Sequence, residues 1–392
     1  MKRVIIAVID SMGIGAMPDC EKFGDVHECN TLANVAKYCH GLNVPNMQKM
    51  GLGNIGDYEG IAKEENPTAQ YGKMEEKSNG KDTTTGHWEI AGLVLPQAFQ
   101  TFTKTGFPKE VIDKFIELTN CGGVLANIAA SGTAIIKEYN EEHHKTKYPI
   151  IYTSADSVYQ IAVDTDVIPL ETLYEWCRIA RKMFDDMGIN VSRVIARPYK
   201  VINGEPTRIG KDRRDYVLEP FAKTILDEVK ESGGSVIAIG KIEDIFCKKG
   251  VTHAIHTGSN KEGLELTLKA VNNTLELDKI QIAEVKNPDK SFIFTNLVDT
   301  DMLYGHRNDA AGYGKAIEEI DTYVKPITEA MTDEDILIIT ADHGCDPTVA
   351  GTDHTREYVP ILVYGKKLEP KNLGLIKGFD YIANLIRDYM LK

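Results

Sequence analysis

Four segments of the chain carry aspartate and histidine side chains of the kind that bind divalent cations. They are IDSMG at residues 9–13, DTDMLYGH at 299–306, TADHG at 340–344 and GTDHTRE at 351–357. Carboxylates gathered in one place repel one another and raise their pKa values, and a divalent cation removes this cost. Mixed carboxylate and imidazole ligands suit Mn, Zn or Fe better than Ca. Together the segments predict a two-metal site that holds a phosphoryl group and activates an oxygen nucleophile.

Each segment alone also has a simpler interpretation. An aspartate that follows a strand is often a helix N-cap or a turn residue, and a histidine there is usually a hydrogen-bonded structural residue. Cys345 lies two residues after His343 and would be a soft ligand. A bystander thiol is the preferred interpretation, because the oxygen and nitrogen ligands already suffice. The metal hypothesis therefore depends on the convergence of all four segments.

The elements that must position these side chains are short apolar runs that end at polar residues. Such runs occupy residues 4–9, 236–239, 292–298 and 336–339. Runs without alternation are typical of strands buried on both faces of a parallel sheet. Helical patterns at 216–232 and 379–389 accompany them. This alternation predicts an α/β doubly wound domain whose ligands gather at the carboxyl ends of its strands.

The length predicts more than one domain. The chain has 392 residues, whereas single hydrophobic cores usually stop growing near roughly 250–300 residues. The middle third has helix candidates at 108–119 and 170–187 and short apolar strands at 148–152 and 194–196. We therefore expect a smaller α/β domain at residues 100–215, inserted between two parts of the core at 1–99 and 216–392.

Composition excludes several classes of protein. With 45 basic and 58 acidic residues the formal net charge is −13, which disfavours binding to nucleic acid or to an anionic membrane. The apolar runs are far shorter than the roughly 20 residues of a membrane helix, and no signal-peptide pattern follows Met1. The seven cysteines form no CxxC pair and are expected to be reduced thiols. These features predict a cytoplasmic protein.

A phosphoryl site of this kind also needs an attacking oxygen. In SNGKDTTTGHWE, at residues 78–89, a glycine turn leads hydroxyl residues into a predicted helix start. The free backbone N–H groups at such a start favour a phosphate. A simple Thr or Asp N-cap explains the same pattern, and the residues alone do not choose among Thr83, Thr84 and Thr85.

Six segments resemble the signature segments of the phosphopentomutase family, which belongs to the alkaline phosphatase superfamily. In chain order they are VIDSMGIGAMPD (8–19), GKDTTTGHWEIAG (80–92), TSADS (153–157), DMLYGHRND (301–309), TADHGCDP (340–347) and GTDHTREYVP (351–360). The resemblance implies an alkaline-phosphatase-like doubly wound core sheet with an inserted smaller α/β cap domain. It also implies interconversion of ribose 1-phosphate and ribose 5-phosphate, and of the 2-deoxyribose forms.

The resemblance further implies roles for matching residues. Thr83 would carry the phosphoryl group, with a sugar 1,6-bisphosphate or 1,5-bisphosphate as activator. Two Mn²⁺ ions would be held, one by Asp10, Asp342 and His343, the other by Asp301, His306 and His354. The substrate contacts would be Asp156 for a sugar hydroxyl, Arg193 and Lys241 for phosphate, and Ser154.

Three alternatives compete with the mutase. A metal-dependent phosphomonoesterase would use the same core and pass the phosphoryl group to water. A phosphoglycerate mutase of the same superfamily shares the metal ligands but uses a serine, and no serine replaces Thr83. A binding or structural protein stabilised by metals would not need the hydroxyl nucleophile beside the ligands. The TSADS segment and the size of the insert favour the mutase.

Overall fold

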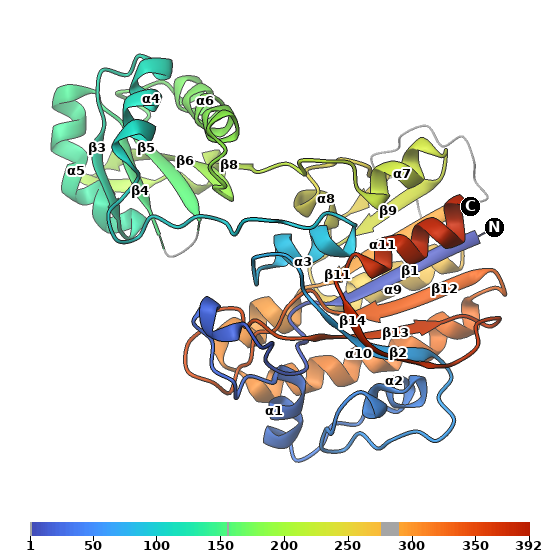
Figure 1. Ribbon diagram of the computed structural model, residues 1–392. Coiled ribbons are helices and arrows are strands. Elements are labelled where there is room, and N and C mark those ends of the chain that lie inside the picture. The colour runs from blue at the N-terminus through green and yellow to red at the C-terminus, as the bar shows by residue number, and fades with distance from the viewer. Residues whose placement is uncertain (1, 155–156, 276–289) are drawn as a thin grey trace. The chain divides into compact units, whose positions relative to one another are not determined.

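The computed structural model describes residues 2–154, 157–275 and 290–392 (Figure 1). The chain divides into two compact units, one of Met1–Pro96 with Pro220–Lys392 and the other of Gln97–Glu219. The insert expected at 100–215 falls within the second unit. In the described ranges, no helix combines the length and apolar character that crossing a bilayer requires.

The first unit is built on an eight-stranded sheet in the order β10-β9-β11-β1-β12-β13-β2-β14. Strands β9, β10, β11, β1 and β12 run parallel to one another. β13 is antiparallel to both of its neighbours, so the sheet is mixed rather than wholly parallel. The strands are β1 (Lys2–Ile9), β2 (Gln70–Glu75), β9 (Ser235–Ile239), β10 (His253–Ile255), β11 (Lys290–Leu297), β12 (Asp335–Thr340), β13 (Val359–Tyr364) and β14 (Asn372–Lys377).

Helices cover this sheet in two packed groups. α1, α2 and α9 pack against α10, whereas α3 packs against α8 and α11. Because β1, β11 and β12 are buried along almost their whole length, both faces of the sheet are covered, which confirms the predicted α/β doubly wound class. The helices are α1 (Thr31–Tyr38), α2 (Pro45–Met50), α3 (Thr83–Ile90), α7 (Ile225–Glu231), α8 (Ile242–Ile245), α9 (Asn260–Val271), α10 (Ala310–Ala330) and α11 (Tyr381–Ile386).

The helix expected at 216–232 is wrong in its first half. The chain there forms strand β8 (Arg214–Val217) of the second unit, and helix α7 begins only at Ile225. Pro220, where the chain enters the first unit, lacks the N–H that a helix interior needs. Phe221, expected on the buried stripe, is 55% exposed.

The second unit has a sheet in the order β3-β4-β5-β6-β7, and β8 also pairs with β6. Helix α4 packs against α6, and both contribute to the apolar core beside β5 and β6. Ser154 directly follows β4, and Arg193 begins β6. The elements are β3 (Leu125–Ala129), β4 (Ile150–Thr153), β5 (Val158–Asp164), β6 (Arg193–Ile202), β7 (Glu205–Arg208), α4 (Lys109–Thr119), α5 (Gly132–Thr146) and α6 (Leu170–Met187).

A buried ion pair joins the beginnings of β1 and β12. The Arg3 guanidinium donates from Nε to Asp335 Oδ1 at 2.9 Å and lies 2.5 Å from Oδ2 through Nη2. It also donates to the carbonyl of Val271. Burial raises the pKa of Asp335, but the donors of Arg3 and Thr332 outweigh it and hold that pKa below its usual value. The pair therefore favours the ionised carboxylate.

We predict that Arg3→Ala lowers the free energy of unfolding by about 3–5 kcal/mol, because it leaves a buried carboxylate without its partner. The loss is full at neutral pH and shrinks as the pH falls below about 4, where Asp335 protonates in the unfolded chain. Urea unfolding followed by Trp88 fluorescence, in a Trp176→Phe background, measures it. Lys63→Ala, which breaks an exposed pair with Asp57 in the same unit, should change stability by less than about 1 kcal/mol. Equal effects of the two variants would contradict the prediction.

Candidate metal centre

The predicted ligands lie at the carboxyl edge of three adjacent strands. Asp10 follows β1, a π-helical turn after β11 carries Asp301, and Asp342 and His343 follow β12. The strand register places β1 between β11 and β12. His306 belongs to the next turn. Segments far apart in sequence thus meet at one edge of the sheet, as expected for ligands of a doubly wound domain.

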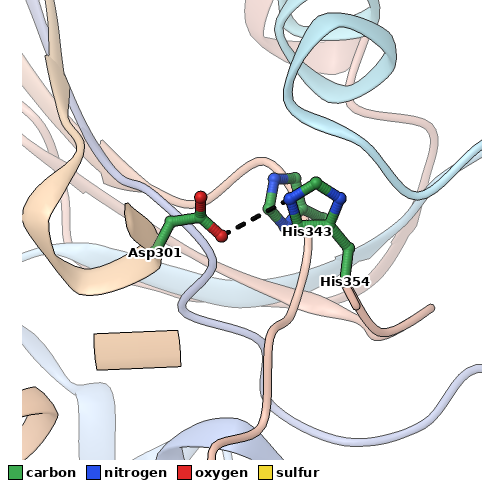
Figure 2. Close-up of side chains that lie close together, drawn as sticks. All are labelled: Asp301, His343 and His354. Carbon is green, nitrogen blue, oxygen red and sulfur yellow. Dashed lines mark ion pairs between the residues drawn. The ribbon is translucent and has the colours of Figure 1, made fainter. Parts of the chain in front are cut away.

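Three groups of side chains converge closely enough to hold a metal ion. Within each group the ligand atoms lie within 4.8 Å of one another. Figure 2 shows the Asp301 carboxylate facing the imidazoles of His343 and His354. Among the described residues the groups are Asp10 with Asp342 and His343, Asp301 with His343 and His354, and Asp301 with His306 and Cys345.

Ion-pair distances connect these side chains into one cluster. His343 Nε2 lies 3.5 Å from Asp10 Oδ1 and 3.4 Å from Asp342 Oδ2. The two oxygens of Asp301 face different imidazoles, with His354 Nε2 at 3.5 Å from Oδ1 and His306 Nε2 at 3.3 Å from Oδ2. The cluster therefore offers carboxylate oxygens and imidazole nitrogens to more than one cation.

The donor set fits divalent cations. Asp10, Asp301 and Asp342 are all buried, and one oxygen of each has no hydrogen-bond partner among the described residues. A buried carboxylate oxygen left in this state is costly unless an ion binds it. Nδ1 of His306 lies 2.6 Å from the carbonyl oxygen of Thr352, and Nδ1 of His343 lies 3.0 Å from that of Gly344. Because Nδ1 donates to these carbonyls, Nε2 is left as the metal-binding nitrogen.

Electrostatics favour a bound cation for the same reason. Burial, together with the negative charges of Asp342 and Asp301, raises the pKa of Asp10 well above its usual value. Burial also raises the pKa of Asp301, but the imidazoles of His306 and His354 that face its two oxygens outweigh it, so that this pKa is lowered. The bond to Asp301 in turn raises the pKa of His306 to about 9. Burial raises the pKa of Asp342 too, but the imidazoles of His343 and His87 lower it overall, so it is Asp10 whose ionisation needs added positive charge.

Outer contacts orient the ligands. Asn296 Nδ2 donates to Asp10 Oδ2 at 2.8 Å, and the backbone N–H of Ser11 donates to Asp342 Oδ1 at 3.1 Å. His87 Nδ1 lies 3.0 Å from Asp342 Oδ2. Partners of this kind fix the direction in which a ligand points. Neither Asn296 nor His87 was predicted from the sequence, although Asn296 lies at the end of β11 and His87 within the segment at residues 80–92.

Thr83, the first residue of α3, lies against the cluster. Its Oγ1 is 3.1 Å from His343 Nε2. Thr85 has a different task, because its hydroxyl donates to Asp82 Oδ2 at 2.6 Å and its N–H donates to Asp82 Oδ1 at 3.2 Å. Asp82 is thus the N-cap of α3, and the structure distinguishes two of the three threonines that the residues alone left open.

Gly86 allows α3 to approach the metal ligands closely. A β-carbon at this position would stand 2.2 Å from the carbonyl oxygen of Asp342 and 2.8 Å from its Cβ. Backbone contacts this close cannot be relieved by turning a side chain. The glycine is therefore what brings the hydroxyl at the start of the helix to the ligand segment.

Arg356, a buried guanidinium, holds the loop before α3. It donates to Glu76 Oε2 at 2.5 Å and to the carbonyls of Ser78 and Gly80 at 2.8 and 2.7 Å. The loop that carries His354 is thereby tied to the loop that leads into Thr83. Sequence analysis missed this role, because a buried arginine and its partners share no local pattern.

Glu357 ties two further segments together. Its buried carboxylate accepts hydrogen bonds from the N–H groups of Gly15 and Thr31, at 3.0 and 2.9 Å, and from the hydroxyl of Thr355 at 2.6 Å. Lys81 adds a partly exposed link, with Nζ 2.8 Å from Asp25 and 3.1 Å from Asp353. The ligand loops are therefore fixed by polar contacts as well as by the sheet.

Comparison with known proteins agrees with this architecture. The family model described as "Metalloenzyme superfamily" matches residues 2–391. The curated "Phosphopentomutase" of Caldanaerobacter subterraneus subsp. tengcongensis is 51% identical over 389 residues, 99% of this chain and 94% of that one. The protein of the same name from Clostridium novyi is 51% identical over 99% of this chain and 95% of its own. The chain belongs to the phosphopentomutase family. It is therefore an enzyme of the mutase class within a metalloenzyme superfamily.

A solved structure of Leishmania mexicana phosphoglycerate mutase is more distant. It is 11% identical, with a TM-score of 0.48 over 99% of this chain and 95% of that one.

The residues expected to contact the substrate of a phosphopentomutase lie in both units. Lys241 follows β9 at the ligand edge of the first sheet, and its charge lowers the pKa of Asp10. In the second unit Ser154 and Arg193 lie at the same edge of the sheet. Arg193 begins β6 and is paired with Val158, the first residue of β5. The hydroxyl of Thr153, which precedes Ser154, donates to the carbonyl oxygen of Val158. Asp156 lies outside the described residues.

We predict that Gly86→Ala lowers the free energy of unfolding of the protein by about 1–3 kcal/mol or more, because the added methyl group overlaps the backbone of Asp342. Trp88 fluorescence during urea unfolding provides the measurement. Gly210→Ala is the matched control, since no heavy atom lies within 4 Å of the added carbon. Indistinguishable stabilities of the two variants would refute the close approach.

We also predict opposite effects of Asp10→Asn without and with metal. Without metal the variant should be at least as stable as the wild type, because it removes one of three mutually repelling carboxylates. At 100 times the dissociation constant for Mn²⁺ the wild type should gain about 2.7 kcal/mol, and the variant less than half of that. Thermal unfolding in EDTA and in Mn²⁺ measures both, with the exposed Asp57→Asn as control. A large loss of stability of Asp10→Asn in EDTA would show that repulsion among the three aspartates does not dominate the stability of the metal-free protein.

Proposed function

We propose that this protein interconverts ribose 1-phosphate and ribose 5-phosphate, and the corresponding 2-deoxyribose phosphates. The observation that carries the proposal is the contact of 3.1 Å between Thr83 Oγ1 and His343 Nε2, inside a cluster of carboxylates with unpartnered oxygens. A hydroxyl beside a two-metal cluster is the arrangement that phosphoryl transfer requires. Relatives about 50% identical over the whole chain are named phosphopentomutases, which favours this activity over a phosphoglycerate mutase.

Two Mn²⁺ ions are proposed as the resident cations. One ion would be held by Asp10, Asp342 and His343, and the other by Asp301, His306 and His354. Both ions would screen the charge of the phosphoryl oxygens and stabilise the threonine alkoxide. The mixed oxygen and nitrogen donors support manganese over calcium. Each of the three aspartates has one oxygen without a hydrogen-bond partner, which supports two ions rather than one.

Thr83 would carry the phosphoryl group between two sugar positions. Once phosphorylated, Thr83 would donate its phosphoryl group to the free hydroxyl of a sugar monophosphate. The bond from phosphorus to Thr83 Oγ1 would break and a bond to the sugar oxygen form, with Thr83 Oγ1 leaving as the alkoxide and the sugar hydroxyl proton passing to solvent. The other phosphate of the resulting 1,5-bisphosphate then returns to Thr83. Free N–H groups at the start of α3 stabilise the phosphoryl oxygens. A sugar 1,6-bisphosphate or 1,5-bisphosphate supplies the first phosphoryl group.

The second unit is proposed to act as a cap over the substrate. Ser154, Asp156 and Arg193 would contact the sugar phosphate from this unit, and Lys241 from the core. Asp156 suits a sugar hydroxyl, while the two cationic side chains suit phosphate. Exclusion of water by a cap protects phosphothreonine from hydrolysis. Small pentose phosphates are the proposed partners in the cytoplasm, and the net charge of −13 argues against nucleic acid and anionic membranes.

The proposal is tested by incubating the protein with Mn²⁺, ribose 5-phosphate and a trace of glucose 1,6-bisphosphate while phosphorus NMR follows the products. Growth of the ribose 1-phosphate signal with little inorganic phosphate is expected. Release of one inorganic phosphate per substrate would instead identify a phosphatase and overturn the cap assignment.

Thr83→Ala should abolish this turnover while the metal content stays at the wild-type level, because the six proposed ligands are untouched. Thr84→Ala is the matched control, one residue further along the same helix, and should retain incorporation of the phosphoryl group. Mass spectrometry of the protein after treatment with the bisphosphate locates the modified residue. Turnover by the Thr83→Ala variant would move the nucleophile elsewhere in the segment.

A further inference from the structure

Cys345 lies among side chains that bind metals rather than in an ordinary apolar position. Its Sγ is grouped with ligand atoms of Asp301 and His306, all within 4.8 Å of one another, and lies 3.9 Å from His306 Nδ1. Cys345 and Asp301 are buried, and His306 is half-buried. Three ligand types, a thiol, an imidazole and a carboxylate, therefore meet at one place.

Local packing fixes the thiol in this position. Gly305, which precedes His306, lies so close that a β-carbon there would stand 2.9 Å from Cys345 Sγ. The thiol also donates to the carbonyl oxygen of Asp353 at 3.6 Å. The sulfur is thus held between the turn that carries His306 and the loop that carries His354.

The chemistry of these three ligands differs from that of the proposed manganese sites. Thiolate and imidazole ligands with a carboxylate are typical of Zn²⁺, whereas Mn²⁺ prefers oxygen-rich sites. The His306 nitrogen that lies 3.9 Å from Cys345 Sγ is Nδ1, which also donates to the carbonyl oxygen of Thr352, while Nε2 faces Asp301 Oδ2 at 3.3 Å. A thiophilic ion such as Zn²⁺ is therefore expected to bind beside Cys345 more tightly than Mn²⁺ does.

We propose that Asp301, His306 and Cys345 form a binding site for Zn²⁺ that overlaps the site proposed for the second Mn²⁺. A bond forms between the ion and Cys345 Sγ, and the thiol proton passes to solvent. Since Asp301 and His306 are common to both sites, the two ions exclude one another. Only this competition with manganese rests on the proposed function.

Zinc K-edge X-ray absorption on the full-length wild-type protein tests the ligand set directly. After removal of bound metal and addition of Zn²⁺, we expect a sulfur shell at about 2.3 Å. A spectrum fitted by oxygen and nitrogen ligands alone would overturn the proposal, whatever the variants do.

Cobalt provides a second test, because thiolate ligation gives Co²⁺ a near-ultraviolet charge-transfer band. The band should appear in the wild type and in the control variant Cys39→Ser. In the wild type the Cys39 thiol donates a hydrogen bond to the carbonyl oxygen of Ala310, and Cys39 is not one of the grouped metal ligands. It should be absent from Cys345→Ser. A band of wild-type intensity in Cys345→Ser would place the sulfur ligand elsewhere.

Competition is measured by adding Zn²⁺ to the manganese-loaded protein and following free Mn²⁺ by electron paramagnetic resonance. Cys345→Ser should need at least about tenfold more Zn²⁺ to release the same manganese, given that even the loss of an outer contact costs 10–100-fold in metal affinity. An unchanged zinc requirement would contradict the overlap. None of these readouts measures phosphoryl transfer, so failure of the mutase proposal would leave the zinc result standing.

Discussion

Mutual repulsion among three buried aspartates is the constraint on which the rest of the first unit depends. Asp10 and Asp342 follow neighbouring parallel strands, Asp301 follows the strand on the other side of β1, and the register leaves them no means of separating. Parallel strands share a carboxyl edge whatever side chains follow them. Burial then removes the water that would screen these charges. The sheet thus creates an electrostatic cost that a cation removes, and metal affinity and fold stability become linked quantities.

The loops around the cluster carry further buried charges, Arg356 and Glu357, whose polar atoms have hydrogen-bond partners. Arg356 donates to one oxygen of Glu76 and to two carbonyls, and both oxygens of Glu357 accept from backbone and hydroxyl donors. Both are charged groups buried as deeply as the aspartates, yet almost every polar atom they bring has a partner. Among the described residues, the three aspartate ligands each keep one buried oxygen without a hydrogen-bond partner, and so do Glu76, Asn296 and Asp299. At the three aspartates, a bound cation would supply the partner that these oxygens lack.

Sequence reasoning succeeded where the information is local. Apolar runs without alternation predicted the buried strands, and the helices at 108–119 and 170–187 agree closely with α4 and α6. It failed at 216–232, where the chain passes between units at Pro220 and tertiary context overrides the periodic pattern. The antiparallel direction of β13 also has no local signature. The ligand segments could be found because each couples a strand end to acidic or imidazole groups. Arg356, Asn296 and His87 could not, since their partners lie up to 337 residues away.

Metal choice in such a cluster is decided by ligand softness more than by position. Nitrogen and oxygen sites generally bind Zn²⁺ more tightly than Mn²⁺, so a manganese enzyme depends on the supply of metal as well as on its ligands. A buried thiol beside two of the ligands increases the difference in affinity between Zn²⁺ and Mn²⁺, because thiolate binds the softer Zn²⁺ more strongly. His354, on the far oxygen of Asp301, favours the oxygen and nitrogen arrangement instead. Asp301 faces His306 with one oxygen and His354 with the other. We therefore expect Zn²⁺ to bind on the His306 side of this carboxylate, beside Cys345, and Mn²⁺ to bind with His354 as well.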